Sequence, residues 1–161
     1  MANHPNIISS VLTANVHSVD ELDALDSSTE SIIVENNSCN DEDFTELDFS
    51  RFTNLKSLIV GDYCFKYVIS MNVVGLDHLE RIKIGRNSFR NLYGGGYSFS
   101  VKNCSRLREL KIGPSSFDEW QRIEIEDLPS LEVIEMGYLH YNRPIFDSAS
   151  LELKGRPTIA Q

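Results

Sequence analysis

A phrase of eleven residues occurs in four copies in this chain, and its regular spacing limits the folds that the chain can adopt. The clearest copy reads Leu-Arg-Glu-Leu-Lys-Ile-Gly-Pro-Ser-Ser-Phe and ends at Phe117. The leading leucines are Leu55, Leu79, Leu107 and Leu131, and the closing aromatic residues are Phe65, Phe89, Phe117 and Tyr141. Successive copies are separated by 24, 28 and 24 residues. A repeat of this length is typical of a solenoid, in which each coil buries its apolar edge against the next coil.

A second apolar motif precedes each leading leucine. It consists of two apolar residues separated by one other residue, which is the alternation expected of a β-strand with one buried face. The pairs are Leu47/Phe49, Met71/Val73, Phe99/Val101, Ile123/Ile125 and Leu151/Leu153. Each coil is therefore predicted to contain two strands. We expect a strand-rich, right-handed solenoid of about five coils of roughly 24–28 residues, with parallel sheets.

The end of the phrase is predicted to form a turn. The glycines at 61, 85, 113 and 137 follow the second strand and suit a turn that requires a positive φ angle. The aromatic residue four positions later is expected to point inward and to stack on its neighbours in a column. Trp120 and Cys104 fall on apolar positions of other coils, so we also assign them to the core. A degenerate copy of the phrase runs from Ser31 to Cys39, with Val34 equivalent to Val60.

The residues before the first repeat are predicted to form an arm and a cap. Residues 1–17 show no periodicity and are expected to be disordered. Ser18 and Glu21 fit a capping box that opens a short cap helix assigned to residues 18–30, with Leu22 on its apolar face. Residues 31–161 then form the solenoid. No leucine phrase follows its last strand. Either Arg156-Pro157 ends the pairing, since proline cannot donate to a ladder, or the chain is cut from a longer array or self-associates through this C-terminal edge.

Two coils are longer than the others because they carry additions after the aromatic residue. One addition is Tyr93–Tyr97 and the other surrounds residues 143–147, so both leave the same face of the solenoid. In repeat proteins such additions often mark the binding face. Aromatic and arginine side chains are enriched at interfaces, which makes four residues candidates for partner binding. These are Tyr93, Tyr97, Arg143 and Phe146. The alternative is that the loops pack against the body of the solenoid.

The charge of the chain argues against some classes of partner. The net charge of −9 disfavours nucleic acid and anionic membranes, which require a basic surface. The first 50 residues contain eleven acidic residues and neither Lys nor Arg. This acidic end favours either a basic partner or, more simply, solvation. On the outward strand positions, Ile59, Lys83, Lys111 and Glu135 form one stripe, which is predicted to be a solvated ladder on which recognition can be superimposed.

The cysteines and the termini bear on the compartment. No apolar run reaches the length of about twenty residues that a membrane helix requires, and no signal peptide is recognisable. Three cysteines are too few for a disulfide scaffold and favour a reducing compartment, the cytoplasm. Cys39 and Cys64 lie on adjacent coils, either as free thiols or as a disulfide.

The sequence contains no catalytic motif. It lacks Gly-x-Ser-x-Gly, His-Glu-x-x-His and the phosphate-binding Gly-x-x-x-x-Gly-Lys-Ser/Thr pattern. The glycine run 94–96 lacks the following lysine of a phosphate loop, and the four histidines share no metal-binding spacing. We therefore expect a protein without enzymatic activity, cofactor or metal.

The repeats resemble those of leucine-rich-repeat proteins, especially the bacterial-surface and protist type whose coils end in Ile-Gly-x-x-(Ala/Ser)-Phe. The residues that carry the resemblance are Leu79-x-x-Ile82-x-Ile84-Gly85-x-x-Ser88-Phe89 and Leu107-x-x-Leu110-x-Ile112-Gly113-x-x-Ser116-Phe117. The match covers about residues 31 to 155. The chain departs from the commonest leucine-rich repeat in lacking the turn asparagine of Leu-x-x-Asn-x-Leu in every coil.

The resemblance implies a protein-binding or adhesive scaffold without catalysis. Two functional hypotheses follow. In the first, the chain is a protein–protein interaction module that binds a partner through its insertion-loop face or a strand face. In the second, it is a structural or adhesive segment of a longer repeat array that associates end to end.

Overall fold

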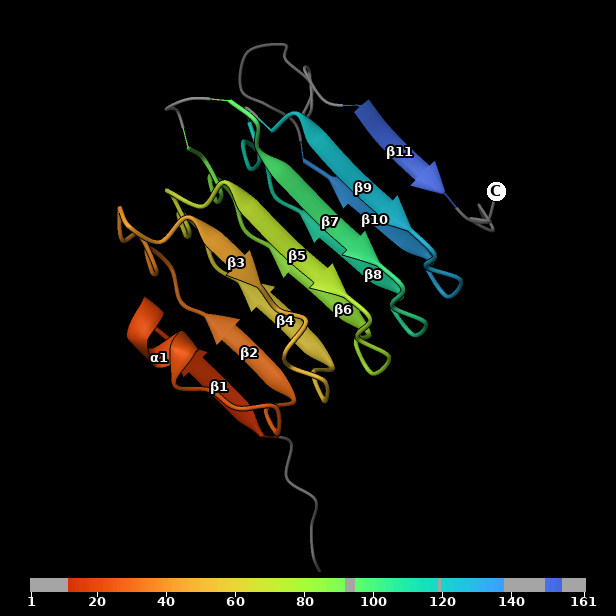
Figure 1. The fold of residues 1–161 in the computed structure, drawn as a ribbon, viewed down its shortest axis with the longest axis horizontal. Helices are drawn as coiled ribbons and strands as arrows, with labels where there is room; N and C mark the ends of the chain where they lie inside the picture. The colour runs from red at the N-terminus through yellow and green to blue at the C-terminus, as the bar shows by residue number, and fades with distance from the viewer. Residues whose placement is uncertain (1–11, 92–94, 119, 138–149, 155–161) are drawn as a thin grey trace, which may run out of the picture.

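The computed structural model describes residues 12–91, 95–118, 120–137 and 150–154. They form a parallel β-solenoid of about four turns with almost no helix (Figure 1). This confirms the prediction of a strand-rich solenoid with parallel sheets. The expected number of about five coils is not confirmed, because the described residues form about four turns.

Two sheets make up the solenoid. Sheet A contains six strands in the order β1 (Thr13–Val16), β2 (Ser31–Val34), β4 (Ser57–Val60), β6 (Arg81–Ile84), β8 (Glu109–Ile112) and β10 (Val133–Met136). Sheet B contains five strands in the order β3 (Glu46–Asp48), β5 (Ser70–Val74), β7 (Ser98–Lys102), β9 (Arg122–Glu126) and β11 (Ser150–Lys154). In Figure 1 the strands of sheet B lie in front of those of sheet A and run in the opposite direction. From β2 onward the chain therefore alternates between the sheets, whereas α1 stands between β1 and β2.

The strand register follows the repeat. Leu58 pairs with Ile82, and Ile82 pairs with Leu110, so equivalent residues of successive copies lie side by side. Along β2, β4 and β8 the burial alternates between partly exposed and buried residues, as a period of two requires. The apolar pairs predicted for sheet B lie on β5, β7, β9 and β11, and β3 contains Leu47, the first member of its pair. Burial alternates along β5 and β9, whereas β7 also buries Ser100. The sequence thus predicted the strands of the repeats and their pairing, but not β1.

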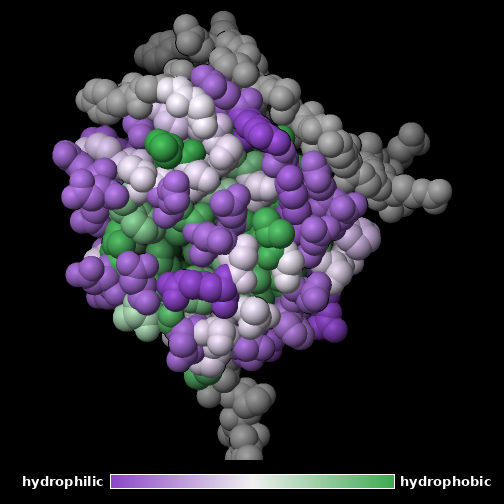
Figure 2. Space-filling view, viewed as in Figure 1, coloured by the Kyte–Doolittle hydropathy of each residue, from purple (hydrophilic) through white to green (hydrophobic). Residues whose placement is uncertain are grey.

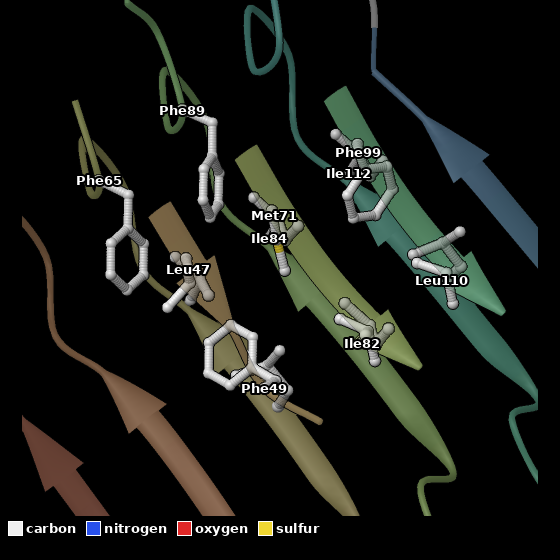
Figure 3. Packing of buried hydrophobic residues seen from close by; sticks show 14 of the residues in the cluster. Leu47, Phe49, Phe65, Met71, Ile82, Ile84, Phe89, Phe99, Leu110 and Ile112 are labelled. Carbon is white, nitrogen blue, oxygen red and sulfur yellow. The ribbon is translucent and has the colours of Figure 1, made fainter. Parts of the chain in front are cut away.

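A single hydrophobic core lies between the sheets (Figure 3). Its most regular feature is the predicted aromatic column. The ring centroids of Phe65 and Phe89 are 5.1 Å apart, and those of Phe89 and Phe117 are 4.7 Å apart with an interplanar angle of 5°. The predicted leucine column is equally well buried at Leu55, Leu79 and Leu107, which are 0% exposed. The fourth aromatic residue, Tyr141, lies outside the described residues.

Both predictions for the N-terminal region need correction. The disordered arm was expected to include residues 1–17, but Thr13–Val16 form β1, which pairs with β2 in parallel. The cap helix is shorter than residues 18–30, because α1 spans only Val19–Asp23. Its predicted start is confirmed: the Ser18 side chain accepts a hydrogen bond from the Glu21 amide, and the Glu21 carboxylate accepts one from the His17 amide.

The front face of the molecule is mostly hydrophilic. Figure 2 shows polar side chains around a central area in which hydrophobic residues are visible. On β5 and β7, the small polar residues Ser70, Asn72 and Ser98 are partly exposed, whereas Ser100 is buried. Lys102 on β7 pairs with Glu124 at 2.7 Å, so the neighbouring coils are linked by charge as well as by the backbone. This face therefore presents a polar, largely self-paired surface.

Candidate functional site

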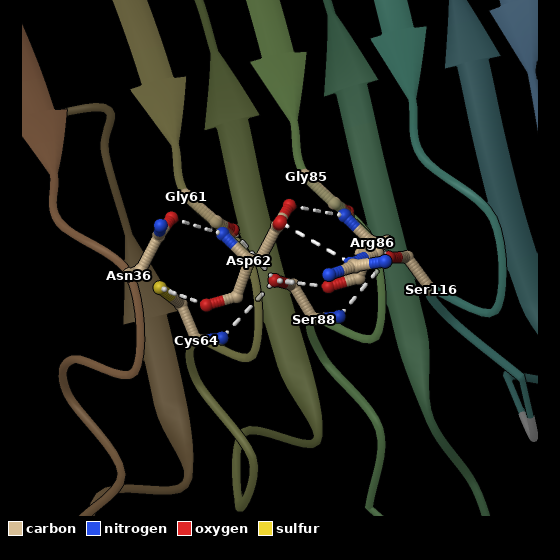
Figure 4. Close-up of polar contacts among 8 residues, drawn as sticks. All are labelled: Asn36, Gly61, Asp62, Cys64, Gly85, Arg86, Ser88 and Ser116. Atoms are coloured by element: carbon tan, nitrogen blue, oxygen red, sulfur yellow. Dashed lines mark hydrogen bonds and ion pairs between the residues drawn. The ribbon is translucent and has the colours of Figure 1, made fainter.

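The turns that follow β2, β4, β6 and β8 build one continuous edge of the solenoid, which we call the glycine corner. It comprises residues 35–40, 61–66, 85–90 and 113–118, and the 93–97 addition begins just beyond it. Figure 4 shows how residues of successive turns lie side by side at this edge. The glycine corner is where the backbone is most tightly constrained.

The predicted reason for its glycines was wrong. None of the glycines at 61, 85, 113 and 137 has a positive φ angle. A Cβ atom on Gly85 would instead lie 2.6 Å from the carbonyl carbon of Gly61, and one on Gly113 would lie 2.6 Å from that of Gly85. Glycine is therefore required because the backbones of successive coils approach one another too closely for a side chain.

The positive φ angles fall on the second and fourth residues after the glycine position. They are Asn37, Cys39, Tyr63, Phe65, Asn87, Phe89, Ser115 and Phe117, with φ between 53° and 59°. Tyr63 donates its amide to Arg86 O of the next coil at 2.9 Å, whereas Phe89 donates to Cys64 O of the preceding coil at 2.9 Å. The left-handed conformation costs about 1–2 kcal/mol per residue. Here it directs the Tyr63 and Phe89 amides to acceptors on the coils on either side.

A ladder of hydroxyl groups runs beneath the corner (Figure 4). The Ser88 hydroxyl accepts the Cys64 amide at 3.1 Å and donates to Gly61 O at 2.8 Å. Ser116 repeats both bonds one coil later, with the Ser88 amide at 3.0 Å and Gly85 O at 2.7 Å. Both serines are fully buried. The serine of the repeated phrase therefore joins coils through hydrogen bonds.

Replacing Ser88 with alanine is expected to lower the free energy of unfolding by about 1–3 kcal/mol, because the buried Cys64 amide loses its acceptor. Urea denaturation measures the change. The control is Ser115→Ala, which changes a partly exposed serine next to Ser116 on the following coil. We expect it to change the free energy of unfolding by no more than about 0.5 kcal/mol. Equal losses for the two variants would contradict the proposed role of the ladder.

A second ladder lies on the outside of the corner. The Asp62 amide donates to the Asn36 side-chain oxygen at 2.8 Å, and the Arg86 amide donates to the Asp62 carboxylate at 2.9 Å. The series stops there without an orphaned donor. The guanidinium of Arg86 has no acceptor to offer the next coil, and the residue at that position, Pro114, has no amide N–H.

These ladders hold an exposed aromatic and cationic surface in place, the corner surface. It consists of Tyr63, Lys66, Tyr67, Arg86 and Arg90. The Tyr63 ring is 44% exposed, and the Arg86 guanidinium lies 5.6 Å from its centroid. Arg86 is also paired with Asp62 at 3.3 Å, and the Tyr63 carbonyl accepts the Asn40 side chain at 2.9 Å. The Tyr63–Arg86 pair thus projects from a backbone that is fixed on both sides.

Of the four residues predicted to bind a partner, only Tyr97 lies within the described residues. The expectation that it is an exposed anchor was wrong. Tyr97 is 1% exposed, its ring centroid is 6.0 Å from that of Trp120, and its carbonyl accepts the Gln121 and Arg122 amides. Tyr93, Arg143 and Phe146 lie outside the described residues. The predicted burial of Trp120 is confirmed, and its indole N–H donates to Phe89 O at 2.8 Å.

The corner surface was not recognised from the sequence. Tyr63 and Arg86 stand at variable positions of the repeated phrase, two residues and one residue after the glycine, respectively. One signal in the sequence could have pointed to them. The residue type changes from coil to coil at these two positions, whereas the positions of the phrase that form the core keep the same kind of residue in each coil. The predicted stripe of outward residues is confirmed, since Lys83 pairs with Ile59 and Lys111, and Lys111 forms an ion pair with Glu135 at 3.4 Å.

All three cysteines are free and buried. Of the two arrangements considered for Cys39 and Cys64, the structure has the free thiols. Burial raises the pKa of all three thiols, and that of Cys39 rises to about 12, with the nearby Cys64 and Asp41 adding to the shift. Thiols that stay protonated at neutral pH are poor nucleophiles, so these cysteines serve the core.

The raised pKa of Cys39 predicts that stability falls in alkaline solution. As the pH rises above 9.0, the ordinary pKa of a thiol, Cys39 loses its proton in the unfolded chain but keeps it in the folded chain until about pH 12. The unfolded state therefore binds fewer protons, and the free energy of unfolding decreases with pH. Denaturant titrations at pH 8 and 10 measure the decrease, which should be smaller for Cys39→Ala. An equal decrease in the variant would contradict the prediction.

Other surfaces offer less for recognition. A groove of about 630 Å³ lies at the opposite edge of the solenoid, between the turns around Arg106 and Leu131. Its charged residues include Arg108 and Glu132, which pair with each other at 3.0 Å. Within the described ranges, no group of three or more His, Cys, Asp or Glu residues could hold a metal ion, and no helix is long and apolar enough to cross a membrane.

Comparison of the chain with protein-family models, with curated proteins and with solved structures found no match. The repeat geometry and the corner surface therefore carry the functional argument.

Proposed function

We propose that this chain is a non-enzymatic protein–protein interaction module of the leucine-rich-repeat type, and that it binds its partner through the corner surface. The observation that carries the proposal is the exposed Tyr63–Arg86 pair on a backbone that hydrogen bonds fix from both neighbouring coils. Tyrosine and arginine are among the residues that dominate binding energy at protein interfaces.

The rigidity of the corner favours binding. A surface that is already ordered loses little conformational entropy on association, so more of the contact energy appears as affinity. The ladders of Ser88 and Asp62 and the paired amides of Tyr63 order this surface before any partner arrives. In the sequence, the additions of the two long coils follow the aromatic residue that ends this turn, and in repeat proteins such additions often mark the binding face.

The recurring Ile-Gly-x-x-Ser-Phe phrase supports the leucine-rich-repeat type, and the three free thiols support a reducing compartment such as the cytoplasm. The strand faces are weaker candidates because the exposed aromatic residue of the described part of the chain, Tyr63, lies at the corner and not on a strand face.

The experiment is site-specific photocrosslinking followed by titration. A photoreactive phenylalanine analogue at position 63 should yield a specific adduct with the partner, whereas the analogue at His78, on the opposite edge, should not. Binding of the purified partner is then measured by calorimetry. Tyr63→Ser combined with Arg86→Ser should weaken binding by about thirtyfold or more.

The matched control is Lys56→Ser combined with His78→Ser, which changes two exposed residues of the opposite edge. We expect unchanged affinity for the control and unchanged thermal stability for both double variants. A partner that crosslinks through position 78, or that binds the Tyr63 and Arg86 variant with full affinity, would refute the corner as the binding site.

A further inference from the structure

The C-terminal end of sheet A exposes part of the core. Ile134 on β10 is 39% exposed, although its equivalents on the other strands, Ile32, Leu58, Ile82 and Leu110, are 0% exposed. Leu131 is only partly buried, whereas the leading leucines of the preceding coils are fully buried. The apolar columns therefore continue to β10 and meet no further described coil.

The backbone of β10 is open on the same side. Val133 and Gly137 donate their amides back to Arg108 O and Ile112 O of the preceding coil. Because successive residues of a strand direct their polar groups to opposite sides, Ile134 directs its N–H and C=O to the free edge. In sheet A, β10 pairs only with β8 among the described strands. Such an edge is a template for pairing with another strand.

The opposite end of sheet A is formed by β1, which pairs only with β2 among the described strands. Leu12, next to β1, is 51% exposed. Leu12, Tyr63 and Ile134 are the exposed large hydrophobic residues of the described part of the chain, so two of the three lie at the two ends of sheet A. In Figure 1, α1 lies beside β1 at this end, where sheet B has no strand.

We propose that β10 of one copy of this chain pairs in parallel with β1 of a second copy, so that sheet A continues from copy to copy. The register of the β1–β2 pair is the same as that of the β8–β10 pair, so the pattern of pairing can be continued from β10 of one copy to β1 of the next. Continuing that register places Ile134 beside Ala14, whose small side chain leaves room for it, and Met136 beside Val16. Val133 then lies beside Thr13 and Glu135 beside Asn15.

The charges of the two edges are compatible with this pairing. None of the four pairs brings like charges together, and the residue beside Glu132 is Leu12. A contact between two different edges is heterologous, so it generates a chain of copies rather than a closed dimer. The association is independent of the corner surface, which lies on another side of each coil. Because α1 occupies the layer of sheet B at that end, pairing is limited to one strand and should be weak.

The experiment is sedimentation of the full chain from micromolar to millimolar concentration. The wild-type mass should rise with concentration. Asn15→Lys places a cation opposite Glu135 and should tighten association by up to about fivefold, whereas Asn15→Glu should weaken it. Ile134→Lys should abolish it. Ile59→Lys adds the same charge on the outer face of β4 and should leave association unchanged.

Mixing distinguishes this arrangement from a symmetric dimer. The Ile134→Lys variant keeps an unchanged β1 edge, and the Asn15→Glu variant keeps an unchanged β10 edge. In a mixture of the two, β10 of the Asn15→Glu chain can therefore pair with β1 of the Ile134→Lys chain. The mixture should therefore give mainly a one-to-one dimer, with fewer longer species than the wild-type chain forms at the same concentration. A wild-type chain that stays monomeric up to millimolar concentration, or association that is insensitive to the charge at position 15, would overturn the proposal.

Discussion

Replacing Phe89 with alanine is expected to lower the free energy of unfolding by about 3–5 kcal/mol. The Phe89 ring is fully buried in the middle of the aromatic column, with centroids 5.1 Å from Phe65 and 4.7 Å from Phe117. It also meets the ring of Trp120 edge-on at 5.9 Å. Its loss removes contacts to two neighbouring coils at once and leaves a cavity that the stacked backbones cannot close. Denaturant unfolding measures the effect.

Tyr63→Ala is the matched control. Tyr63 is also an aromatic residue with a positive φ angle at the glycine corner, with φ of 59° against 55° for Phe89, but its ring is exposed. Alanine at either position keeps the same backbone strain, so the comparison isolates the buried ring. We expect a loss below about 1 kcal/mol for Tyr63→Ala. Similar losses for the two variants would show that the column does not hold the coils together.

Replacing Gly85 with alanine is expected to destabilise the fold by about 3 kcal/mol, the upper end of the usual cost of overpacking. The added Cβ atom would lie 2.6 Å from both the carbonyl carbon and the carbonyl oxygen of Gly61, and 2.4 Å from the Asp62 carboxylate. Two of these atoms belong to backbone that is fixed by its own hydrogen bonds, so the coils must separate locally. The loss should appear in both thermal and denaturant unfolding.

Gly75 provides the control for this substitution. It has a φ angle of +71°, and a Cβ atom there would meet nothing within 4 Å. The equivalent residues of the next two coils are Asn103 and Asp127, which adopt φ angles of 53° and 51°. We therefore expect Gly75→Asn to change stability by no more than about 0.5 kcal/mol. A larger loss for Gly75→Asn than for Gly85→Ala would contradict the account of the glycine column.

Much of the fold was predictable because each coil repeats the same physical problem. The alternation at Leu58 and Val60 recurs at Ile82 and Ile84, so strands, register and buried faces follow from one pattern. The aromatic column followed in the same way, because a buried ring at a constant position of every coil must meet its own copies. β1 was missed because only Ala14 and Val16 continue the pattern, 18 residues before Ile32 and Val34.

The parts that were not predictable depend on distances between coils. A glycine at a turn usually indicates a positive φ angle. Only the structure shows that at Gly85 the backbone of the preceding coil lies too close for any side chain. Tyr97 stands in an addition without a repeat partner, so its burial against Trp120 could not be read from the spacing. The corner surface arises from Tyr63 and Arg86 on different coils, and their proximity exists only once the coils are stacked.

The register of the coils is the claim on which everything else depends, and engineered disulfides test it most directly. Ser57 and Arg81 are paired across β4 and β6 on the outer face of sheet A, so cysteines at these two positions should oxidise readily to a disulfide. Cysteines at Ser57 and Lys83 are displaced by two residues along the strand and should remain reduced under the same conditions. Faster cross-linking of the displaced pair, or none for the paired positions, would contradict the stacking described for this chain.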